Sequence, residues 1–444
     1  MKQIIIYVIA LTIFVGEAVA SESDQNVANR ASKYAFTLDD CIKFALQNNF
    51  DIKTANESIK QQKAVKKEAM SNLLPSVTLS TGVTKTDREM LKKLAPVGSQ
   101  ILDRSWDASA TATQTIFAGG RNVALLQRES LMQKSLEKRL QWITENTIFA
   151  VKSNFYDALL ARSQVEVQEQ LVELLSKELT SETNKFQAGI VPQFNVLRAE
   201  VSLANSKAPL IRAQNNYRIA IEELRRVLGL IDTDTKLQTL LDIDGEFENR
   251  QYDIDLDAAL EIAHNNRAEL EELQAAIAAQ RKIVWAARTE YLPQVNAFAK
   301  YGTQNRYGEN KFYGDGAEGW AVGAIASWNV FDGFGSDARV EQAIAARNIL
   351  TTAKSNQKLS IEVEVRRAYS TLLEAKALLE ASIKVTEQAE ESVRLARSAV
   401  DAGTGIQLDV LQSQYDLTDA RNNKIRALYD YNMAVARLDR AIGR

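Results

Sequence analysis

The residue types that most often perform catalysis or bind metals are scarce in this chain. Among its 444 residues there is one histidine, His264, and one cysteine, Cys41. Catalytic triads and zinc sites need histidine or cysteine in sets, and a disulfide needs two cysteines. We therefore expect Cys41 to be a small packing residue in a helix, and His264 to have no catalytic or metal role. The protein is expected to bind no cofactor and not to be an enzyme.

The charge balance and the scarcity of helix breakers narrow the class of protein. The 54 basic and 57 acidic residues give a net charge of -3, so no basic footprint indicates a nucleic-acid partner. Hydrophobic residues make up 45% and charged residues 25%, which excludes wholesale disorder and a polytopic helical membrane protein. Only five prolines and 19 glycines occur in the whole chain, which favours long helices with few interruptions.

The first 20 residues have the features of a secretory signal peptide. Lys2 precedes the apolar run 4–15, and Ala18-Val19-Ala20 forms a cleavage site of small residues. The alternative is a retained transmembrane anchor, but the run is short for a span. No later segment offers about 18 consecutive apolar residues. A mature protein that crosses a membrane must therefore do so with β-strands.

The rest of the chain is a tandem repeat. Leu74-Pro75 recurs as Leu292-Pro293 at an offset of 218 residues. At offsets of 213 or 214 further pairs follow in order: Trp106 and Trp320, Phe117 and Phe331, Tyr156 and Tyr369, Gly189 and Gly403, Tyr217 and Tyr431, and Gly229 and Gly443. Chance does not produce this order over about 190 residues. We infer two copies of one unit, at 21–240 and 241–444.

Each copy reads as a helix, two strands, a long helix, a tight turn and a second helix. Period-2 alternation predicts strands at about 76–86 and 105–117, and at about 294–303 and 320–331. Their length suits a tilted strand that crosses a bilayer. Aromatic residues near the strand ends resemble an interfacial girdle: Trp106, Trp320, Trp328, Tyr291 and Tyr301. The alternative is an ordinary soluble sheet in which these aromatic residues fill a core.

The helices between the strands are too long for a compact domain. Residues 119–189 contain no proline, and a helix of about 70 residues spans about 105 Å. Its apolar residues recur with near-heptad spacing in a narrow stripe, which favours side-by-side packing of coiled-coil type. A coiled-coil scaffold without a pore is the alternative, although it would not require four strands.

The number of strands limits the assembly that can close a barrel. Four strands from one chain cannot close, and unclosed edges are not tolerated in lipid. Two chains give eight strands, whose interior is filled by side chains. Three chains give twelve strands and room for a channel. A homotrimer with quasi-sixfold symmetry is therefore the smallest assembly that makes a pore.

Several short motifs, in this order and duplicated, resemble the TolC-like outer-membrane efflux proteins. They include Ile-Phe-Ala-Gly-Gly at 116–120, Val-Phe-Asp-Gly at 330–333, and two tip motifs at 188–197 and 402–411. The resemblance implies an α+β membrane protein in the outer membrane of a Gram-negative bacterium. Its long antiparallel α-helical barrel lies in the periplasm, and its four transmembrane β-strands complete a twelve-strand barrel in a trimer. The implied partners are outer-membrane lipid, a periplasmic adaptor (membrane fusion) protein and an inner-membrane pump.

In that family, the two turns at the matching glycines form the periplasmic tip, where the adaptor docks. The resemblance places there the turns 188–195 and 402–409, with Ala188, Gly189, Ile190, Val191, Pro192, Asn195, Ala402, Gly403, Thr404, Gly405 and Asp409. Asp409 matches a position that resembles the family's acidic constriction, where a ring of carboxylates favours cations. The alternative is that Asp409 only complements a helix N-terminus.

This sequence departs from the type member at Gly405, Gln412 and Val400, where that protein has arginine, a second aspartate and tyrosine. The details of gating therefore do not transfer. Two functions are open within the family, namely efflux of small molecules and type I secretion of a protein. We favour efflux on the overall resemblance of 186–229.

Overall fold

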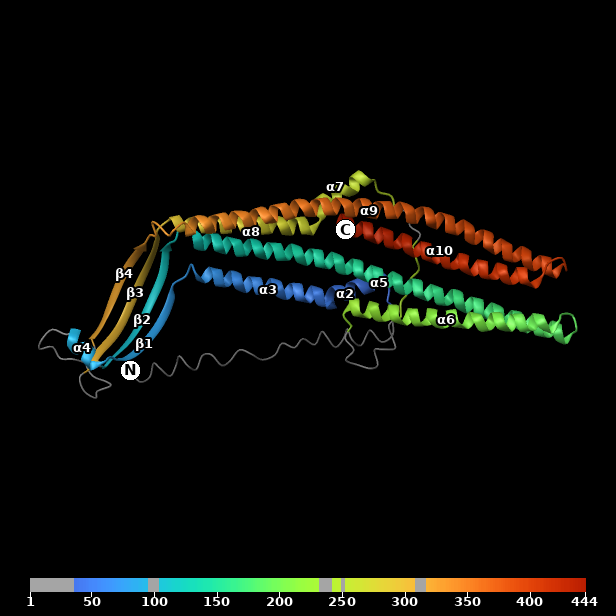
Figure 1. Ribbon diagram of the computed structural model, residues 1–444, viewed down its shortest axis with the longest axis horizontal. Coiled ribbons are helices and arrows are strands. Elements are labelled where there is room, and N and C mark those ends of the chain that lie inside the picture. Colours follow the sequence, from blue (N-terminus) through green and yellow to red (C-terminus); the bar gives the residue numbers. More distant parts are fainter. Residues whose placement is uncertain (1–35, 95–103, 231–241, 249–251, 308–316) are drawn as a thin grey trace. The chain divides into compact units, whose positions relative to one another are not determined.

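The computed structural model describes residues 36–94, 104–230, 242–248, 252–307 and 317–444. The expected signal peptide at 1–20 lies outside the described residues. The chain divides into two compact units (Figure 1). We call Leu46–Phe149, Arg250–Glu380 and Asp430–Arg444 the strand unit, and Met1–Ala45, Ala150–Asn249 and Ala381–Tyr429 the tip unit.

A four-stranded antiparallel sheet in the order β1-β2-β3-β4 lies at one end of the strand unit (Figure 1). Its strands are β1 (Ser76–Lys85), β2 (Arg104–Phe117), β3 (Gln294–Tyr307) and β4 (Ala317–Ser327). One rung of the register joins Val77, Ala112, Ala299 and Val322 across all four strands. The valines at the two ends of this rung are 68% and 69% exposed. One face of the sheet is thus apolar and exposed.

The helices of the strand unit have the same order as the strands they adjoin (Figure 1). α3 (Phe50–Ser71) precedes β1, α5 (Arg121–Gln187) follows β2, α8 (Ala268–Arg288) precedes β3, and α9 (Gly335–Asp401) follows β4. Side-chain hydrogen bonds and an ion pair join neighbours in turn: Gln62 to Glu129, Lys138 to Glu271, and Gln280 to the carbonyl of Ala343. The helices therefore form one layer that continues the sheet.

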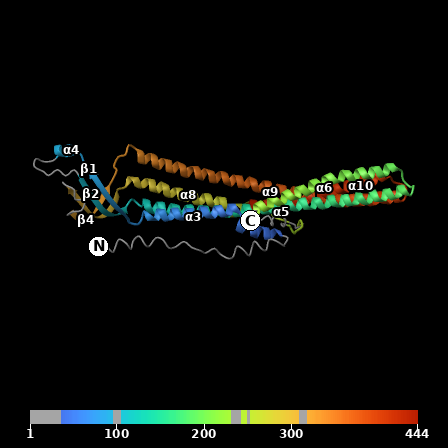
Figure 2. The ribbon, with the colours of Figure 1, turned by 90° about the horizontal axis from the view of Figure 1, so that it is seen from below.

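The tip unit contains the distal parts of α5 and α9 with α6 (Gln193–Leu228) and most of α10 (Gln407–Ile442). These helices form two hairpins, α5 with α6 and α9 with α10 (Figure 1). The hairpins overlap in the view of Figure 2 and are joined by hydrogen bonds from Gln407 to Glu178 and from Arg421 to Gln170. The core of the tip unit includes Phe155, Leu159, Leu224, Leu228 and Ile243, all nearly inaccessible to solvent. The expected long helices and small antiparallel sheet are thus confirmed.

Corresponding elements of the two halves of the chain have matching lengths. α5 and α9 each contain 67 residues, and α6 and α10 each contain 36. α2 (Leu38–Asn48) and α7 (Leu256–Asn266) each contain 11 residues. This equality supports the interpretation of the chain as two copies of one unit. Among the described helices, none combines the length and the apolar composition needed to cross a membrane.

The bounds of two strands differ from those expected. β3 continues to Tyr307 because its pairing with β2 extends to Arg104. The expectation that the fourth strand reaches residue 331 was wrong, since β4 ends at Ser327, opposite Gln294. The residue immediately before β3 is Pro293, which has no backbone N–H to donate to a partner strand. A short helix, α4 (Arg88–Leu94), also lies between β1 and β2.

A buried arginine joins three helices of the strand unit. Arg267, 4% exposed, lies between α7 and α8. Its guanidinium donates to the carbonyl of Ala441 at 3.0 Å and pairs with Glu269 at 2.6 Å and with Glu364 at 2.9 Å. Arg440 pairs with the other oxygen of Glu364 at 2.6 Å. The C-terminal end of α10 is thereby held against α8 and α9.

Removal of this arginine should destabilise the strand unit. Arg267→Ala leaves two carboxylates and a helix-end carbonyl without their buried donor. Loss of one partner of a buried ion pair typically lowers the free energy of unfolding by about 3–5 kcal/mol. We expect a decrease of about 2 kcal/mol here because Glu364 is partly exposed. Denaturant unfolding followed by circular dichroism measures the change. Lys60→Ala, which removes an exposed pair with Glu57, is the control and should change stability by less than about 0.5 kcal/mol.

Candidate functional site

Both tip turns have the same backbone geometry. Gly189 and Gly403 end α5 and α9 with φ values of 77° and 74°, in the left-handed region that glycine adopts without strain. The N–H of Ile190 donates to the carbonyl of Lys185, and that of Gly189 to Phe186. The same two bonds form around Gly403, from Thr404 to Ala399 and from Gly403 to Val400. Each turn is therefore a Schellman motif.

The backbone alone requires glycine at these two positions. A Cβ atom added at Gly189 or Gly403 would have no other atom within 4 Å. At Gly405, in contrast, an added Cβ would lie 3.0 Å from the Cβ of Ala399, so packing restricts this position. The first turn instead ends at Pro192, the N-cap of α6 with φ -74° and ψ 155°. The two turns match in their glycines and differ in how the chain leaves them.

Large apolar side chains are exposed around both turns. Ile190 is 72% exposed and Ile406 is 60% exposed. Phe194, 61% exposed, lies under the guanidinium of Arg198, 4.9 Å from the ring centroid. Exposed apolar patches on a folded protein commonly mark contact surfaces. Each tip turn carries exposed apolar side chains.

A layer of polar contacts lies beside the first turn. Glu182, 2% exposed, accepts from Lys185 at 2.8 Å and from the side chain of Asn195 at 3.4 Å. Four residues earlier on α5, Glu178 accepts a hydrogen bond from Gln407 at the start of α10. Burial, and then the neighbouring carboxylate of Glu182, raise the pKa of Glu178. The two glutamates thus connect α5 to α6 and to α10.

Of the expected tip residues, Asn195 takes part in this polar layer and Asp409 does not. Asp409 lies exposed in the first turn of α10, a position where a carboxylate stabilises the helix N-terminus. Glu178 and Glu182 were missed by the sequence analysis. Their spacing of four residues within a near-heptad stripe was the available signal, although it does not distinguish buried carboxylates from exposed ones.

The five expected interface aromatics fall into two groups. Trp328 follows β4 and donates from its indole Nε1 to the carbonyl of Tyr291 at 3.1 Å, at the junction of strands and helices. Trp106, Tyr301 and Trp320 lie on the apolar face of the sheet, and Tyr301 is directly opposite Trp320. Because β3 continues to Tyr307 and β4 begins at Ala317, before the expected start at 320, Tyr301 and Trp320 lie within strands rather than at their ends.

The distance between the two groups is compatible with an apolar band. Trp106 pairs with Asn305, and Gln294 marks the junction end of β3. Eleven residues of strand rise about 36 Å, or about 25 Å along the membrane normal at a tilt of 45°.

The single histidine and cysteine lie apart from the tip turns. His264 Nε2 is 3.2 Å from a carboxylate oxygen of Glu362 in the strand unit. Cys41 is fully buried in the core of the tip unit, and burial raises the pKa of its thiol to about 12. A thiol with this pKa is protonated and unreactive at neutral pH.

Comparison with known proteins places most of the chain in one family. The profile of the family described as "Outer membrane efflux protein" matches residues 41–230 and 259–444. The alkaline protease secretion protein AprF of Pseudomonas aeruginosa is 24% identical over 308 residues, which cover 68% of this chain and 62% of AprF. The outer membrane protein TolC of Vibrio cholerae is 22% identical over 386 residues, or 84% of this chain and 83% of TolC.

The fold is also shared with solved structures. The CmeC outer membrane channel of Campylobacter jejuni superposes with a TM-score of 0.80 at 15% identity. The superposition covers 98% of this chain and 90% of CmeC. At this identity the likeness establishes a common fold.

The raised pKa of Glu178 makes the stability of the tip unit depend on pH. The folded protein binds this proton more tightly than the unfolded chain, so stability rises as pH falls from neutral towards the ordinary glutamate pKa. Glu178→Gln keeps an acceptor for Gln407 without the charge. We expect a higher midpoint of thermal unfolding at pH 8 than in the unaltered protein, and a smaller difference at pH 5.

Glu173→Gln is the matched control for this prediction. Glu173 lies on the same helix but is exposed, and its hydrogen bond from Lys177 lowers its pKa. The control should therefore be slightly less stable at pH 8. A lower midpoint for Glu178→Gln at pH 8 would contradict the assignment of a buried, disfavoured charge.

Proposed function

Because the chain belongs to the outer membrane efflux protein family, we propose that it is the outer-membrane exit duct of a tripartite export system. In this role it passes small molecules across the periplasm and the outer membrane. The observation that carries the proposal is the sheet of the strand unit, whose exposed apolar face continues into a layer of long helices. A soluble sheet would cover such a face with its own core.

The duct is a homotrimer. Among the described strands, β1 and β4 each pair on one side only. Pairing of β1 from one copy with β4 from the next satisfies the backbone of both edges, and three copies close twelve strands around a channel. The exposed apolar face then contacts the lipid of the outer membrane. Trp106, Tyr301 and Trp320 face this lipid, and Tyr291 and Trp328 lie at its periplasmic boundary.

The tip turns are the docking surface for the periplasmic adaptor protein, which connects the duct to an inner-membrane pump. Exposed apolar side chains on both turns, including Ile190, Phe194 and Ile406, support this assignment. The docking segments are Ala188 to Pro192 with Asn195, and Ala402 to Gly405 with Asp409. Energy for transport comes from the pump, since the family consists of channels. Asp409 either attracts cations at the entrance or only stabilises its helix.

Secretion of a protein is the second candidate function. It is favoured by the similarity to AprF, which is named for the secretion of alkaline protease. A non-pore scaffold is the third reading, and the similarity of the fold to an outer membrane channel weighs against it.

Retention of a fluorescent pump substrate distinguishes the first two functions. A strain that lacks the gene should retain more substrate than its parent, and the gene supplied in trans should restore the parental level. Unchanged retention, together with loss of a protein from the culture supernatant, would replace efflux by protein secretion.

Substitution of the tip glycines tests the docking surface. Proline cannot adopt the positive φ of Gly189 or Gly403, so Gly189→Pro and Gly403→Pro should abolish transport while trimers still form. Gly189→Asn is the control at the same position, because asparagine tolerates the left-handed region, and it should keep most of the transport. Normal transport in both proline variants would remove the tip turns from the docking surface.

A further inference from the structure

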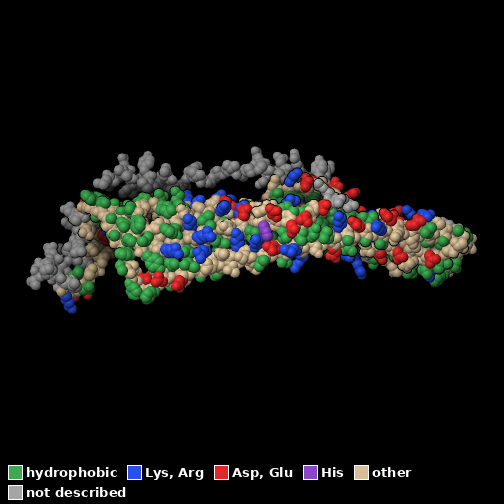
Figure 3. Space-filling model, turned by 90° about the horizontal axis from the view of Figure 1, so that it is seen from above, with side chains coloured by type: hydrophobic (Ala, Val, Ile, Leu, Met, Phe, Trp, Pro, Cys, Tyr) green, Lys and Arg blue, Asp and Glu red, His purple; other side chains and the backbone are tan. Residues whose placement is uncertain are grey.

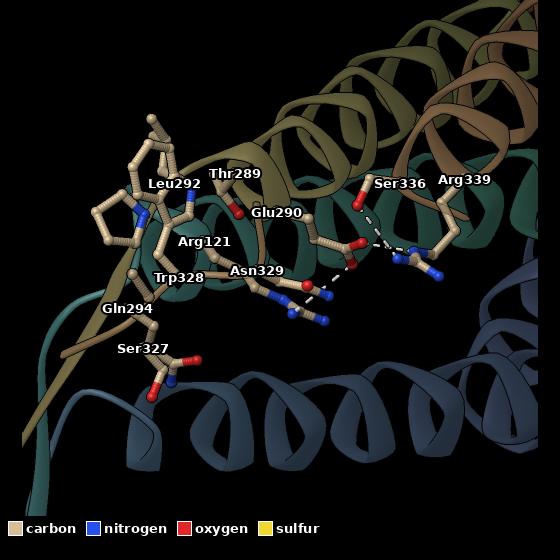
Figure 4. A pocket seen from close by; sticks show the side chains of 12 residues that line it. Arg121, Thr289, Glu290, Leu292, Gln294, Ser327, Trp328, Asn329, Ser336 and Arg339 are labelled. Atoms are coloured by element: carbon tan, nitrogen blue, oxygen red, sulfur yellow. Dashed lines mark hydrogen bonds and ion pairs between the residues drawn. The ribbon is translucent and has the colours of Figure 1, made fainter. Parts of the chain in front are cut away.

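A pocket lies where the strands and helices of the strand unit meet (Figure 4). Its volume is about 510 Å³. It is lined by Arg121 at the start of α5, by Glu290 and Leu292 before β3, by Trp328 after β4 and by Arg339 in α9. Three parts of the chain that are distant in sequence, around residues 121, 290 and 328–339, therefore converge on it.

The two arginines of the pocket differ in their hydrogen bonding. Arg339 donates to Glu290, to Asp332 at 2.9 Å and to Ser336 at 3.3 Å. The nearest carboxylate oxygen to Arg121 is Glu290 Oε1, at 3.9 Å from Nη1, which is beyond hydrogen-bond distance. The Arg121 side chain is 51% exposed. Among the described residues, its guanidinium has an ion-pair neighbour but no hydrogen-bond acceptor.

The charges of the pocket leave room for one anion. The charged side chains that line the pocket are Arg121, Arg339 and Glu290, which sum to one positive charge. Asp332 does not line the pocket and is hydrogen-bonded to Arg339 beside it. Both carboxylates are hydrogen-bonded to Arg339, so the donors of Arg121 remain for a ligand. A guanidinium binds phosphate oxygens through two parallel hydrogen bonds. A phosphate group with a single negative charge matches this arrangement.

The surroundings of Arg121 are suited to an amphiphile rather than to a free ion. Leu292, Pro293 and Trp328 form one apolar wall of the pocket, and the rest of its lining is mainly polar. In the segment that follows Trp328, Phe331 is 73% exposed and Phe334 is 69% exposed. Hydrophobic side chains gather on the surface where α8 and α9 meet the strands (Figure 3). Inorganic phosphate makes no favourable contact with apolar side chains, whereas the acyl chains of a lipid do.

We propose that this pocket binds the phosphodiester of a membrane phospholipid, with Arg121 as the donor and the apolar wall against the acyl chains. The inference rests on the proposed function, in which the junction lies at the periplasmic boundary of the membrane. It adds a lipid site held by specific residues to the general contact of the strands with lipid.

Binding is measured on the full chain purified in a non-ionic detergent. Phosphatidylglycerol is titrated and counted by native mass spectrometry, beside diacylglycerol, which has the tails alone, and inorganic phosphate, which has the ion alone. Arg121→Gln should weaken phosphatidylglycerol binding about tenfold, the effect of one charge-assisted hydrogen-bonding group. Arg121→Lys keeps the charge without the two-pronged geometry and should give an intermediate affinity.

Arg139→Gln is a closely matched control. Arg139 lies on the same helix, is 57% exposed, and has a similar loose ion pair, 3.8 Å from Glu272. It does not line the pocket, so its replacement should leave binding unchanged. The tryptophan fluorescence contributed by Trp328 is the part of the emission that is lost in Trp328→Phe. Phosphatidylglycerol with brominated acyl chains should quench this part.

Several results would overturn the inference. Two concern the ligand: diacylglycerol binds as tightly as phosphatidylglycerol, or inorganic phosphate alone displaces the lipid. Two concern the protein: Arg121→Gln and Arg139→Gln lose the same amount of lipid affinity, or the fluorescence of Trp328 is not quenched. Failure of the proposed function is separable from these outcomes, because binding is measured on purified protein. Export without lipid binding refutes this inference alone, and lipid binding without any export refutes the proposed function alone.

Discussion

Backbone hydrogen bonding at the edges of the sheet is the constraint on which the rest of the architecture depends. Within the described strands, the outer edges of β1 and β4 have no partner strand, and each unsatisfied N–H or C=O group costs several kcal/mol in hydrocarbon. The apolar rung from Val77 to Val322 lies on an exposed face of the same sheet, and burial of such a face away from water is favourable. Pairing with another copy of the chain satisfies the edges, and in the proposed function lipid covers the apolar face. A larger core within one chain would cover only the face.

The order of the strands also determines the order of the helices. Each strand adjoins one long helix, and contacts such as Gln62 with Glu129 and Lys138 with Glu271 join the helices in the same sequence. A layer of this kind has two open sides, like the sheet. The narrow apolar stripes of α5 and α9 are consistent with packing against one neighbour on each side rather than around a broad core.

Sequence reasoning predicted the elements well because their signals are local. Period-2 alternation, the absence of proline over 119–189, and the glycines at 189 and 403 each depend on a few neighbouring residues. The expected end of β4 was wrong because it depends on Pro293, which precedes the partner strand β3 and is distant in sequence. Glu182 and the pocket at Arg121 were missed for the same reason, since burial and convergence of distant segments have no signature in a single stretch of sequence.

The two tip turns show how far the repeated halves have diverged. Gly189 and Gly403 form the same Schellman motif, so the helix ends are interchangeable. The exits are not, because Pro192 caps α6 whereas Gly405 packs against Ala399. Phe194 and Arg198 follow only the first turn, and Leu408 and Asp409 follow only the second. A partner that engages both turns therefore meets two chemically different surfaces, because the repeated halves share the backbone of the turn but not the side chains around it.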